Sequence, residues 1–482
     1  MQGFILSQLI LLVSTFYLVF FEEVDIDIFF VFSFITVSIL AKEAGDWLLG
    51  RRCLFDPASF VSIFSYVYFF FSPILQRHWQ FWPSFPELQF YDGWLIFWSF
   101  LMMFGALIYR FSAMLLTPFM NKPSMYIYSF DKRRFYFLSI VFTFIGALSQ
   151  LFIYIKFGGV SGFMNTFTER QDLSAAVFDP FSGMGVQMLL ADGYRNAFAV
   201  LLVVYFMDKP VRNKWWFFPA IILIMVFVNF IFGGLKGSRG AVVYSLFWGV
   251  GMYHFFIKKI SIKYAVSGIL FLFVFLNSYY WYKFAGLDGL QAIWDSEYRS
   301  TLNQGLREEN VKFVLSRDLG RMDFQTLTLR KVLDDDFDLS LGRSYISSIF
   351  SIIPDSLLSQ ENKMPSITKE KTELIFGSGS YVHGDIRATT NLLGQYGELF
   401  VNFGLVGGFA FFTFIAFFVT FIKKFVVGLD SKDVRLLLVP MLSLLVIKFF
   451  MYDSAVFSQF LLRNFIYIMP LYAFSLVRNQ RG

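Results

Sequence analysis

The segment GSGSYVHGDIRATTNLLGQYGELFVNF, from Gly377 to Phe403, contains the boundary on which the predicted fold depends. It ends the longest polar interval of an otherwise apolar chain and continues directly into a hydrophobic stretch. His383, Asp385 and Arg387 fall within five positions, and small and amide side chains follow them. This pattern predicts a polar layer that meets a membrane-embedded part of the chain, with ionisable groups concentrated at the junction.

The composition of the whole chain predicts a polytopic integral membrane protein. Apolar residues make up 56% of the 482 residues, and Phe alone occupies 68 positions. A soluble domain has no interior large enough for so much hydrocarbon. In a membrane protein the positions of the charged residues say more than the net charge of +6, which therefore does not indicate a nucleic-acid partner. One cysteine, Cys53, and three histidines are too few for an intrachain disulfide or a Cys/His metal site. We expect the chemistry to rest on Arg, Lys, Asp and Glu, without a metal or other cofactor.

About twelve windows of the chain are long and apolar enough to cross roughly 30 Å of hydrocarbon as helices. The first window lacks a basic leader and a cleavage pattern, so we interpret it as a retained span. The windows lie near residues 3–21, 24–41, 57–76, 93–110, 135–155, 187–207, 215–234, 241–257, 264–282, 399–422, 434–452 and 455–477. The predicted organisation is nine spans in residues 1–282, a large loop in residues 283–398 and three spans in residues 399–482.

The connections between spans predict the orientation. The links after the second, fourth, sixth, eighth and tenth spans are rich in base, whereas the first link is acidic. Because Lys and Arg are retained on the cytoplasmic side, both termini are expected in the cytoplasm and residues 283–398 outside. The bases are Lys42, Arg51, Arg52, Arg110, Lys122, Lys132, Arg133, Arg134, Lys209, Arg212, Lys214, Lys258, Lys259, Lys263, Lys423, Lys424, Lys432 and Arg435, with Arg478 and Arg481 in the tail.

The outer interval of about 110 residues is too long for a connector and too charged for lipid. Apolar residues recur at helical spacing in residues 290–302 and 345–353, and Pro354 ends the second of these segments. These segments predict amphipathic helices that lie on the membrane surface as part of an outer helical layer.

Several ionisable residues lie at membrane depth, where each costs a few kcal/mol on insertion scales. Asp192 and Arg195 are three residues apart in the sixth span, Lys448 and Asp453 flank the outer end of the eleventh, and Arg463 lies in the twelfth. One interpretation is structural, with ion pairs that hold the bundle together. The alternative is a buried cationic pocket for an anionic head group.

The link GGLKGSRGA, from Gly233 to Ala241, places Lys236 and Arg239 on the outer side of the membrane. Glycines allow close approach of a ligand to the backbone, and the link opens the next helix at its positive end. This predicts a phosphate or diphosphate site, and a tight turn with two solvated bases is the alternative. Arg343 and Arg387 add guanidinium groups suited to phosphate recognition outside.

Proton transfer has several candidate residues in the lead segment. His383 is a candidate general base, and Asp385 is close enough in sequence to orient it. Glu398 at the head of the tenth span and Asp355 are rival bases, and a solvated loop histidine is the structural alternative.

Four segments in this order resemble the bacterial O-antigen or capsular oligosaccharide repeat-unit polymerases of the Wzy type. The resemblance covers most of residues 230–470, together with the layout of many spans and a late outer loop. The segments are GSRGA (Gly237 to Ala241), IIPDSLL (Ile352 to Leu358), GQYGELFVNFGLVGG (Gly394 to Gly408) and DSAVFSQFLLRNF (Asp453 to Phe465).

The resemblance implies a glycosyltransferase of the bacterial inner membrane with a GT-C-like architecture and a periplasmic loop. The donor would be a glycan on undecaprenyl diphosphate, and the acceptor would be a repeat unit on the same lipid. Membrane lipids and a chain-length regulator would be further partners. Combined with the residues above, this assigns Lys236, Arg239, Arg463 and Arg195 to diphosphate, Arg343 and Arg387 to diphosphate or acceptor glycan, and His383, Asp385 or Glu398 to proton transfer. An O-antigen ligase that delivers glycan to lipid A core and a flippase of lipid-linked oligosaccharide are the alternatives.

Overall fold

The described residues of the computed structural model are almost entirely helical. The structure describes residues 1–482 except 83–84, 121–125, 169–182, 236–238, 286–290, 292–293, 304–311, 313, 335–336, 354–366, 378, 382–391, 428 and 481–482. His383, Asp385, Arg387, Lys236 and Asp355 therefore lie outside the described residues.

The first helical group begins at the N-terminus, and side-chain caps define where its helices start. Asp27 accepts a hydrogen bond from the backbone N–H of Phe30 at 3.0 Å, and Asp56 caps the helix that begins at Pro57. The elements are α1 (Gln2–Phe20), α2 (Ile28–Leu40), α3 (Lys42–Leu48), α4 (Pro57–Tyr66), the π-helix η1 (Val67–Phe71), α5 (Ser72–His78), the 3-10 helix η2 (Pro86–Phe90), α6 (Asp92–Leu116) and η3 (Thr117–Met120).

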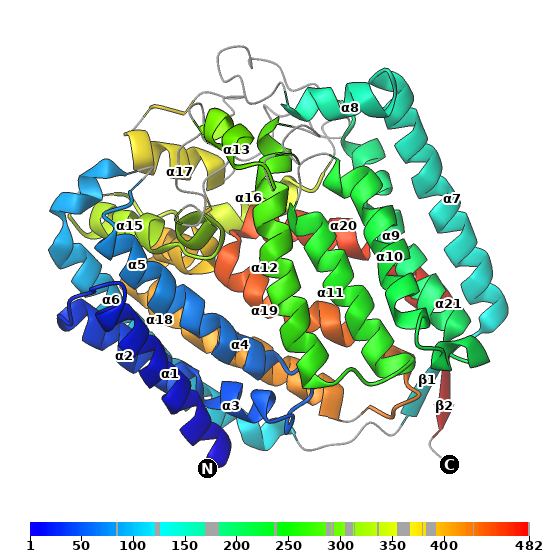
Figure 1. Cartoon of the computed structure of the whole chain (residues 1–482), viewed down its shortest axis with the longest axis horizontal. Coiled ribbons are helices and arrows are strands. Elements are labelled where there is room, and N and C mark those ends of the chain that lie inside the picture. Colours follow the sequence, from blue (N-terminus) through cyan, green and yellow to red (C-terminus); the bar gives the residue numbers. More distant parts are fainter. Residues whose placement is uncertain are drawn as a thin grey trace.

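The second group follows strand β1 (Tyr126–Phe130), and Asp131 caps its first helix through the N–H groups of Arg133 and Arg134. Figure 1 shows this group on the side of the molecule away from α1 and α2. The elements are α7 (Lys132–Lys156), α8 (Gly159–Thr168), α9 (Gly185–Phe206), η5 (Pro210–Asn213), α10 (Phe217–Asn229), the π-helix η6 (Phe230–Gly234), α11 (Arg239–Phe256) and α12 (Ile262–Ala285).

The remaining elements form the outer layer and the C-terminal part of the bundle. Strand β2 (Leu476–Gln480) pairs antiparallel with β1, with Tyr126 opposite Gln480. The others are α13 (Ser296–Asn303), η8 (Val314–Asp318), α15 (Met322–Asp334), α16 (Arg343–Phe350), α17 (Ile367–Phe376), α18 (Gly394–Val427), η11 (Val434–Leu438), α19 (Val439–Met451), α20 (Ser454–Phe465) and α21 (Ile468–Ser475).

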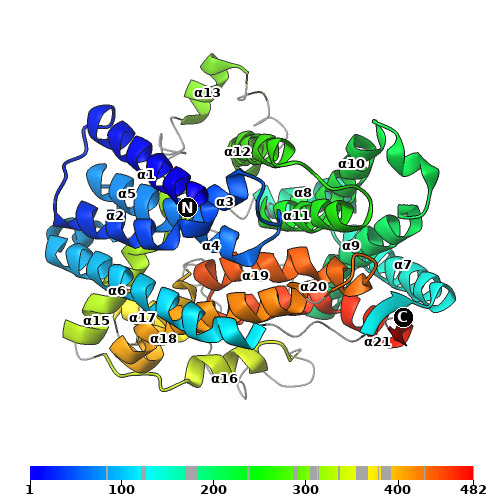
Figure 2. The ribbon, with the colours of Figure 1, turned by 90° about the horizontal axis from the view of Figure 1, so that it is seen from below.

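Helices α18 and α19 run side by side through the centre of the molecule (Figures 1 and 2). Helix α18 also packs on α6, where the absence of a side chain at Gly105 admits the ring of Phe412; a Cβ there would lie 1.9 Å from that ring. The start of α18 has a similar close contact. Gly394 has a φ of +69°, and a Cβ would lie 2.3 Å from the carbonyl oxygen of Phe450. Glycines at these two positions therefore set the distance between the central helices.

Both termini lie at one end of the molecule, together with the β1–β2 pair, and α13 and α17 lie at the opposite end (Figure 1). The basic connections from α6 to α7, α9 to α10 and α11 to α12 are also at the end that contains the termini. The orientation across a membrane that these bases predict stays a prediction.

The described residues contain seven helices that are long and apolar enough to cross a membrane, or eight if α2 and α3, bent by 54°, form one span. An all-α membrane protein is therefore the fold class. A helix overlaps each of the predicted apolar windows, but several of these helices are shorter or broken. The last window, for example, is divided into α20 and α21 at Ile466 and Tyr467.

Two helices of the outer interval contact the bundle in ways that the apolar pattern did not indicate. Helix α15 is buried from Met322 to Leu329 and packs against α6 and α18. Helix α16 places Ser344, Ser347 and Ser348 inward, while Ile346 and Ile349 are 47% and 64% exposed. The amphipathic helix predicted over residues 345–353 thus exists, and its serine face is the one that packs on the protein.

Candidate functional site

Helix α20 connects two polar centres of the bundle, a buried one at its N-terminal end and a partly exposed one at its C-terminal end. It packs against α16 near one end and against α9 and α21 at other points. Its N-cap, Asp453, accepts a hydrogen bond from the N–H of Val456 at 3.1 Å. Helix α20 therefore carries one residue of each polar centre, Ser454 and Arg463.

The first centre surrounds the carboxylate of Glu398, near the start of α18. This side chain is fully buried, and its oxygens accept hydrogen bonds from Ser344 Oγ at 2.6 Å and from the N–H of Ser454 at 2.5 Å. The hydroxyl of Ser454 also donates to Glu398. Asn402, one turn further along α18, donates to Ser344 Oγ at 2.8 Å and accepts from the N–H of Gly342 at 2.7 Å. These contacts hold α16, α18 and α20 together.

A buried ion pair adjoins this cluster. Lys371 of α17 places its Nζ 2.8 Å from Oδ2 of Asp453, and the two side chains are 2% and 0% exposed. Asp453 thus uses one oxygen to cap α20 and the other to bind Lys371. Since Glu398 contacts Ser454, the next residue along, two carboxylates and one ammonium group share this interior region.

A neighbouring carboxylate on α17 lies outside the predicted spans. Burial raises the pKa of Glu370, and a hydrogen bond from Ser340 together with the charge of Arg343 offsets part of the increase. Arg343 begins α16 and is itself exposed. Its guanidinium group is therefore available to solvent or to a ligand on the outer side of this centre.

The second centre lies at the C-terminal end of α20, where two arginines meet one carboxylate. Arg195 Nη2 lies 2.9 Å from Asp192 Oδ1, and Arg463 Nε lies 3.9 Å from Asp192 Oδ2. Arg195 and Asp192 are buried on α9, whereas the side chain of Arg463 is 52% exposed. Nη1 of Arg195 is buried and has no hydrogen-bond partner among the described residues.

A pair of asparagines fixes the relative position of the two helices at the second centre. Asn196 Nδ2 donates to Asn464 Oδ1 at 2.7 Å, directly beside the ion-paired residues. Among the described residues, two guanidinium groups and one carboxylate give this centre a net charge of +1, partly exposed through Arg463. Such a site favours a ligand with negative charge and several acceptor oxygens.

Lys448, near the end of α19, is a third buried basic side chain. Its Nζ donates to Tyr452 Oη at 3.0 Å and lies 2.9 Å from the ring centroid of Tyr244, with Phe460 of α20 at 5.6 Å. No carboxylate of the described residues forms an ion pair with it. Aromatic side chains therefore surround this amino group.

The structure brings together only some of the predicted site residues. Arg195 meets Arg463 at the second centre, while Glu398 lies at the first and Arg343 at its exposed edge. Arg239 begins α11, but its side chain, like Lys236, His383, Asp385 and Arg387, is outside the described part.

Glu398 has a different environment from that expected of a general base. A base must reach the hydroxyl that it deprotonates. Glu398 has no exposed surface and accepts hydrogen bonds at both oxygens. In this arrangement it positions α16 and α20.

Sequence reasoning missed Lys371, Ser344 and Ser454 as members of the first centre. Lys371 stands in the charged segment ITKEKTE, which is typical of a solvated helix. Ser344 and Ser454 carry no signal that separates them from other serines. The apolar residues on both sides of Lys448 and Asp453 were the available indication that charged side chains near the end of α19 are buried.

Comparison of the chain with protein-family models, with curated proteins and with solved structures found no match. The fold and the site therefore define the class of protein by themselves. It is an all-α membrane protein whose described helices include seven that are long and apolar enough to cross a membrane, with two polar centres at the two ends of α20.

Proposed function

We propose that this protein polymerises oligosaccharide repeat units carried on undecaprenyl diphosphate, at the outer face of the bacterial inner membrane. The proposal rests on the resemblance to Wzy-type polymerases and on the chemistry of the second polar centre. It includes about twelve spans, a GT-C-like architecture, cytoplasmic termini and a periplasmic loop.

The observation that carries the proposal is the convergence of Arg195 and Arg463 on Asp192. The two arginines come from helices that are far apart in sequence, and one carboxylate cannot neutralise both. Asp192 lies seven residues, about 10 Å, inside the start of α9, so the excess charge is within the bundle. A diphosphate provides the multiple charged acceptors that two guanidinium groups bind best.

In the proposed reaction a sugar hydroxyl of the acceptor attacks the anomeric carbon of the donor glycan. A new glycosidic C–O bond forms while the C–O bond to diphosphate breaks, and undecaprenyl diphosphate leaves with the electron pair. Arg195 and Arg463, with Lys236 and Arg239, would stabilise the charge that develops on the leaving group.

The remaining proposed roles follow the same division. Arg343 and Arg387 would bind diphosphate or acceptor glycan from the outer layer. His383 or Asp385 would accept the hydroxyl proton, and Glu398 would position α20 and its Arg463 for the reaction.

The test is incubation of purified protein with a defined undecaprenyl diphosphate-linked repeat unit, without nucleotide, followed by mass analysis of the glycan. A ladder that grows by whole repeat units is the expected result. Arg463→Ala should lower the rate at least a hundredfold with little change in Tm, because this side chain is half exposed. Lys424→Ala, an exposed cation at the opposite end of α18, should leave the rate unchanged.

Two outcomes would replace the proposal. Transfer of glycan to added lipid A core without a ladder would establish a ligase. Movement of the oligosaccharide across a vesicle bilayer, with no new glycosidic bond, would establish a flippase. A full ladder from Arg463→Ala would remove the arginine pair from the reaction.

A further inference from the structure

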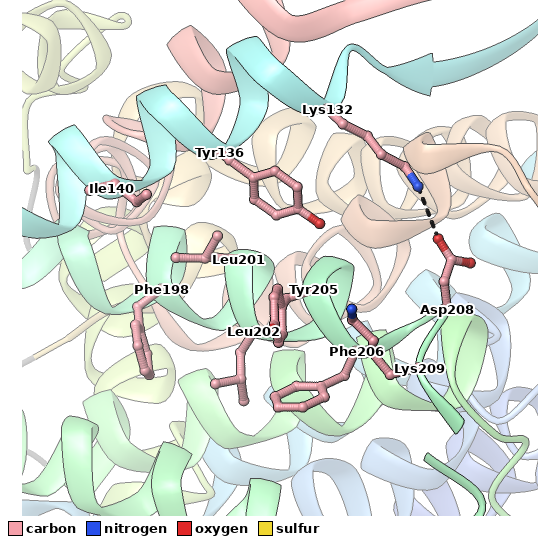
Figure 3. Close-up of a pocket in the computed structure, with 10 residues that line it drawn as sticks. All are labelled: Lys132, Tyr136, Ile140, Phe198, Leu201, Leu202, Tyr205, Phe206, Asp208 and Lys209. Atoms are coloured by element: carbon pink, nitrogen blue, oxygen red, sulfur yellow. Dashed lines mark hydrogen bonds and ion pairs between the residues drawn. The ribbon is translucent and has the colours of Figure 1, made fainter. Parts of the chain in front are cut away.

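An open groove of about 620 Å³ lies between α7 and α9, at the end of these helices that is closest to the basic connections (Figure 3). Its volume is in the range of small-molecule sites. One wall is formed by Tyr136 and Ile140 of α7, and the facing wall by Leu201, Leu202 and Tyr205 of α9. The interior is therefore apolar, and the tyrosines bring aromatic rings to its rim.

Charged side chains surround only one end of the groove. Lys132 lies 3.2 Å from Asp208, so these two charges compensate each other. Lys209 forms no ion pair within the described residues, and its Nζ lies 5.3 Å from the ring centroid of Tyr205. The adjoining segments 131–136 and 207–214 contain six Lys and Arg residues and two Asp residues. Of these, Lys132, Asp208 and Lys209 line the groove, so its mouth has a net charge of +1.

The neighbouring aromatic residues indicate where the groove lies relative to the membrane. Trp215 and Trp216, which follow Lys214, are 87% and 46% exposed, and Tyr205 is 49% exposed. Exposed Trp and Tyr beside Lys and Arg at the end of a span are typical of the membrane–water interface. The apolar part of the groove then lies at acyl-chain depth, and the cations lie at head-group depth.

We infer that this groove binds one anionic phospholipid, with an acyl chain against Ile140 and Leu202 and the phosphate near Lys209. A free phosphate would leave the apolar walls without a ligand group to contact. The excess positive charge favours an anionic head group over a zwitterionic one. The site is distinct from the two polar centres, and the inference does not depend on the proposed reaction.

Native mass spectrometry of the full chain in detergent tests this inference. The probes are dioleoyl phosphatidylglycerol and dioleoyl phosphatidylcholine, which share acyl chains and differ in charge. The expected result is saturable binding of one phosphatidylglycerol with about tenfold preference. Lys209→Gln should lower the affinity for this lipid about fivefold and leave phosphatidylcholine unaffected, as loss of one interfacial charge requires.

Two further variants locate the site. Leu202→Trp, which fills the groove, should abolish the saturable binding of phosphatidylglycerol. Lys424→Gln removes one exposed cation from another basic connection and should bind as the unaltered chain does.

Equal affinity for the two lipids would overturn the inference and indicate only a general acyl-chain surface. Unchanged phosphatidylglycerol binding in Lys209→Gln would place the lipid elsewhere, and because that side chain is exposed the variant should fold normally. Displacement of the lipid by inorganic phosphate at equal concentration would overturn it as well, because only the charge would then be recognised.

Discussion

The Nζ of Lys371 lies 2.8 Å from Oδ2 of Asp453, and neither side chain is more than 2% exposed. This pair connects α17 of the outer layer to the N-cap residue of α20. The outer layer is thus fastened to the interior by a charge contact, in a region where water does not compete with it.

Lys371→Met should destabilise the protein by about 3–5 kcal/mol, because it leaves the Asp453 carboxylate buried and unpaired. Asp453→Asn should cost less, since asparagine also caps helices. The double variant Lys371→Met with Asp453→Asn should recover most of the loss of the single Lys371 variant. Thermal unfolding in detergent measures all three. Additive losses in the double variant would show that the two side chains do not interact.

Glu398→Gln should destabilise by about 1–3 kcal/mol, because the amide nitrogen cannot accept the hydrogen bond that the backbone N–H of Ser454 donates to Oε2. The polymerisation rate per folded molecule should stay the same, so that any fall in the total rate equals the loss of folded protein. Tm and the rate measured on the same preparations test this. An unchanged Tm with a hundredfold lower rate would return Glu398 to proton transfer.

Removal of the positive charge of Arg463 and removal of the negative charge of Asp192 should have opposite effects on the binding of undecaprenyl diphosphate. Arg463→Gln should weaken product inhibition by undecaprenyl diphosphate about tenfold or more, since it removes a charge-assisted hydrogen bond. Asp192→Asn removes the competing carboxylate, so inhibition should persist or strengthen even though stability falls. Equal weakening in both variants would indicate that the ion pair is only structural.

Gly105→Ala should cost about 1–3 kcal/mol, because its Cβ would overlap the ring of Phe412 between α6 and α18. Gly93→Ala in the same helix meets no atom within 4 Å and should change the stability by about 0.5 kcal/mol or less. Thermal unfolding of both variants is the measurement. Equal effects would mean that α6 and α18 do not pack at Gly105.

The raised pKa of Glu370 predicts a pH dependence. The folded protein binds this proton more tightly than the unfolded chain, so the stability contribution is complete below about pH 4.5 and is lost as the pH rises through the raised pKa. Glu370→Gln should therefore gain stability relative to the unaltered protein between pH 4 and pH 8. A constant difference, measured by unfolding across this range, would contradict the shift.

The sequence alone determined the fold class, an all-α membrane protein. A helix overlaps each apolar window, because the length needed to cross hydrocarbon is a local property of the chain. The concentration of bases in alternate links is equally local, and the orientation that it predicts stays a prediction. Arg195 and Arg463 were also identifiable, because charges in apolar windows are conspicuous.

Only the tertiary structure decided which of these charges meet and which faces turn inward. Asp192 and Arg463 come from distant helices, and the burial of Lys371 depends on the position of α20. Helix α16 places serines inward and isoleucines outward. Apolar periodicity does not predict this orientation, because beside a membrane both the lipid and the protein interior accept apolar side chains. The buried hydrogen-bond partners, such as Glu398 for Ser344, select the face.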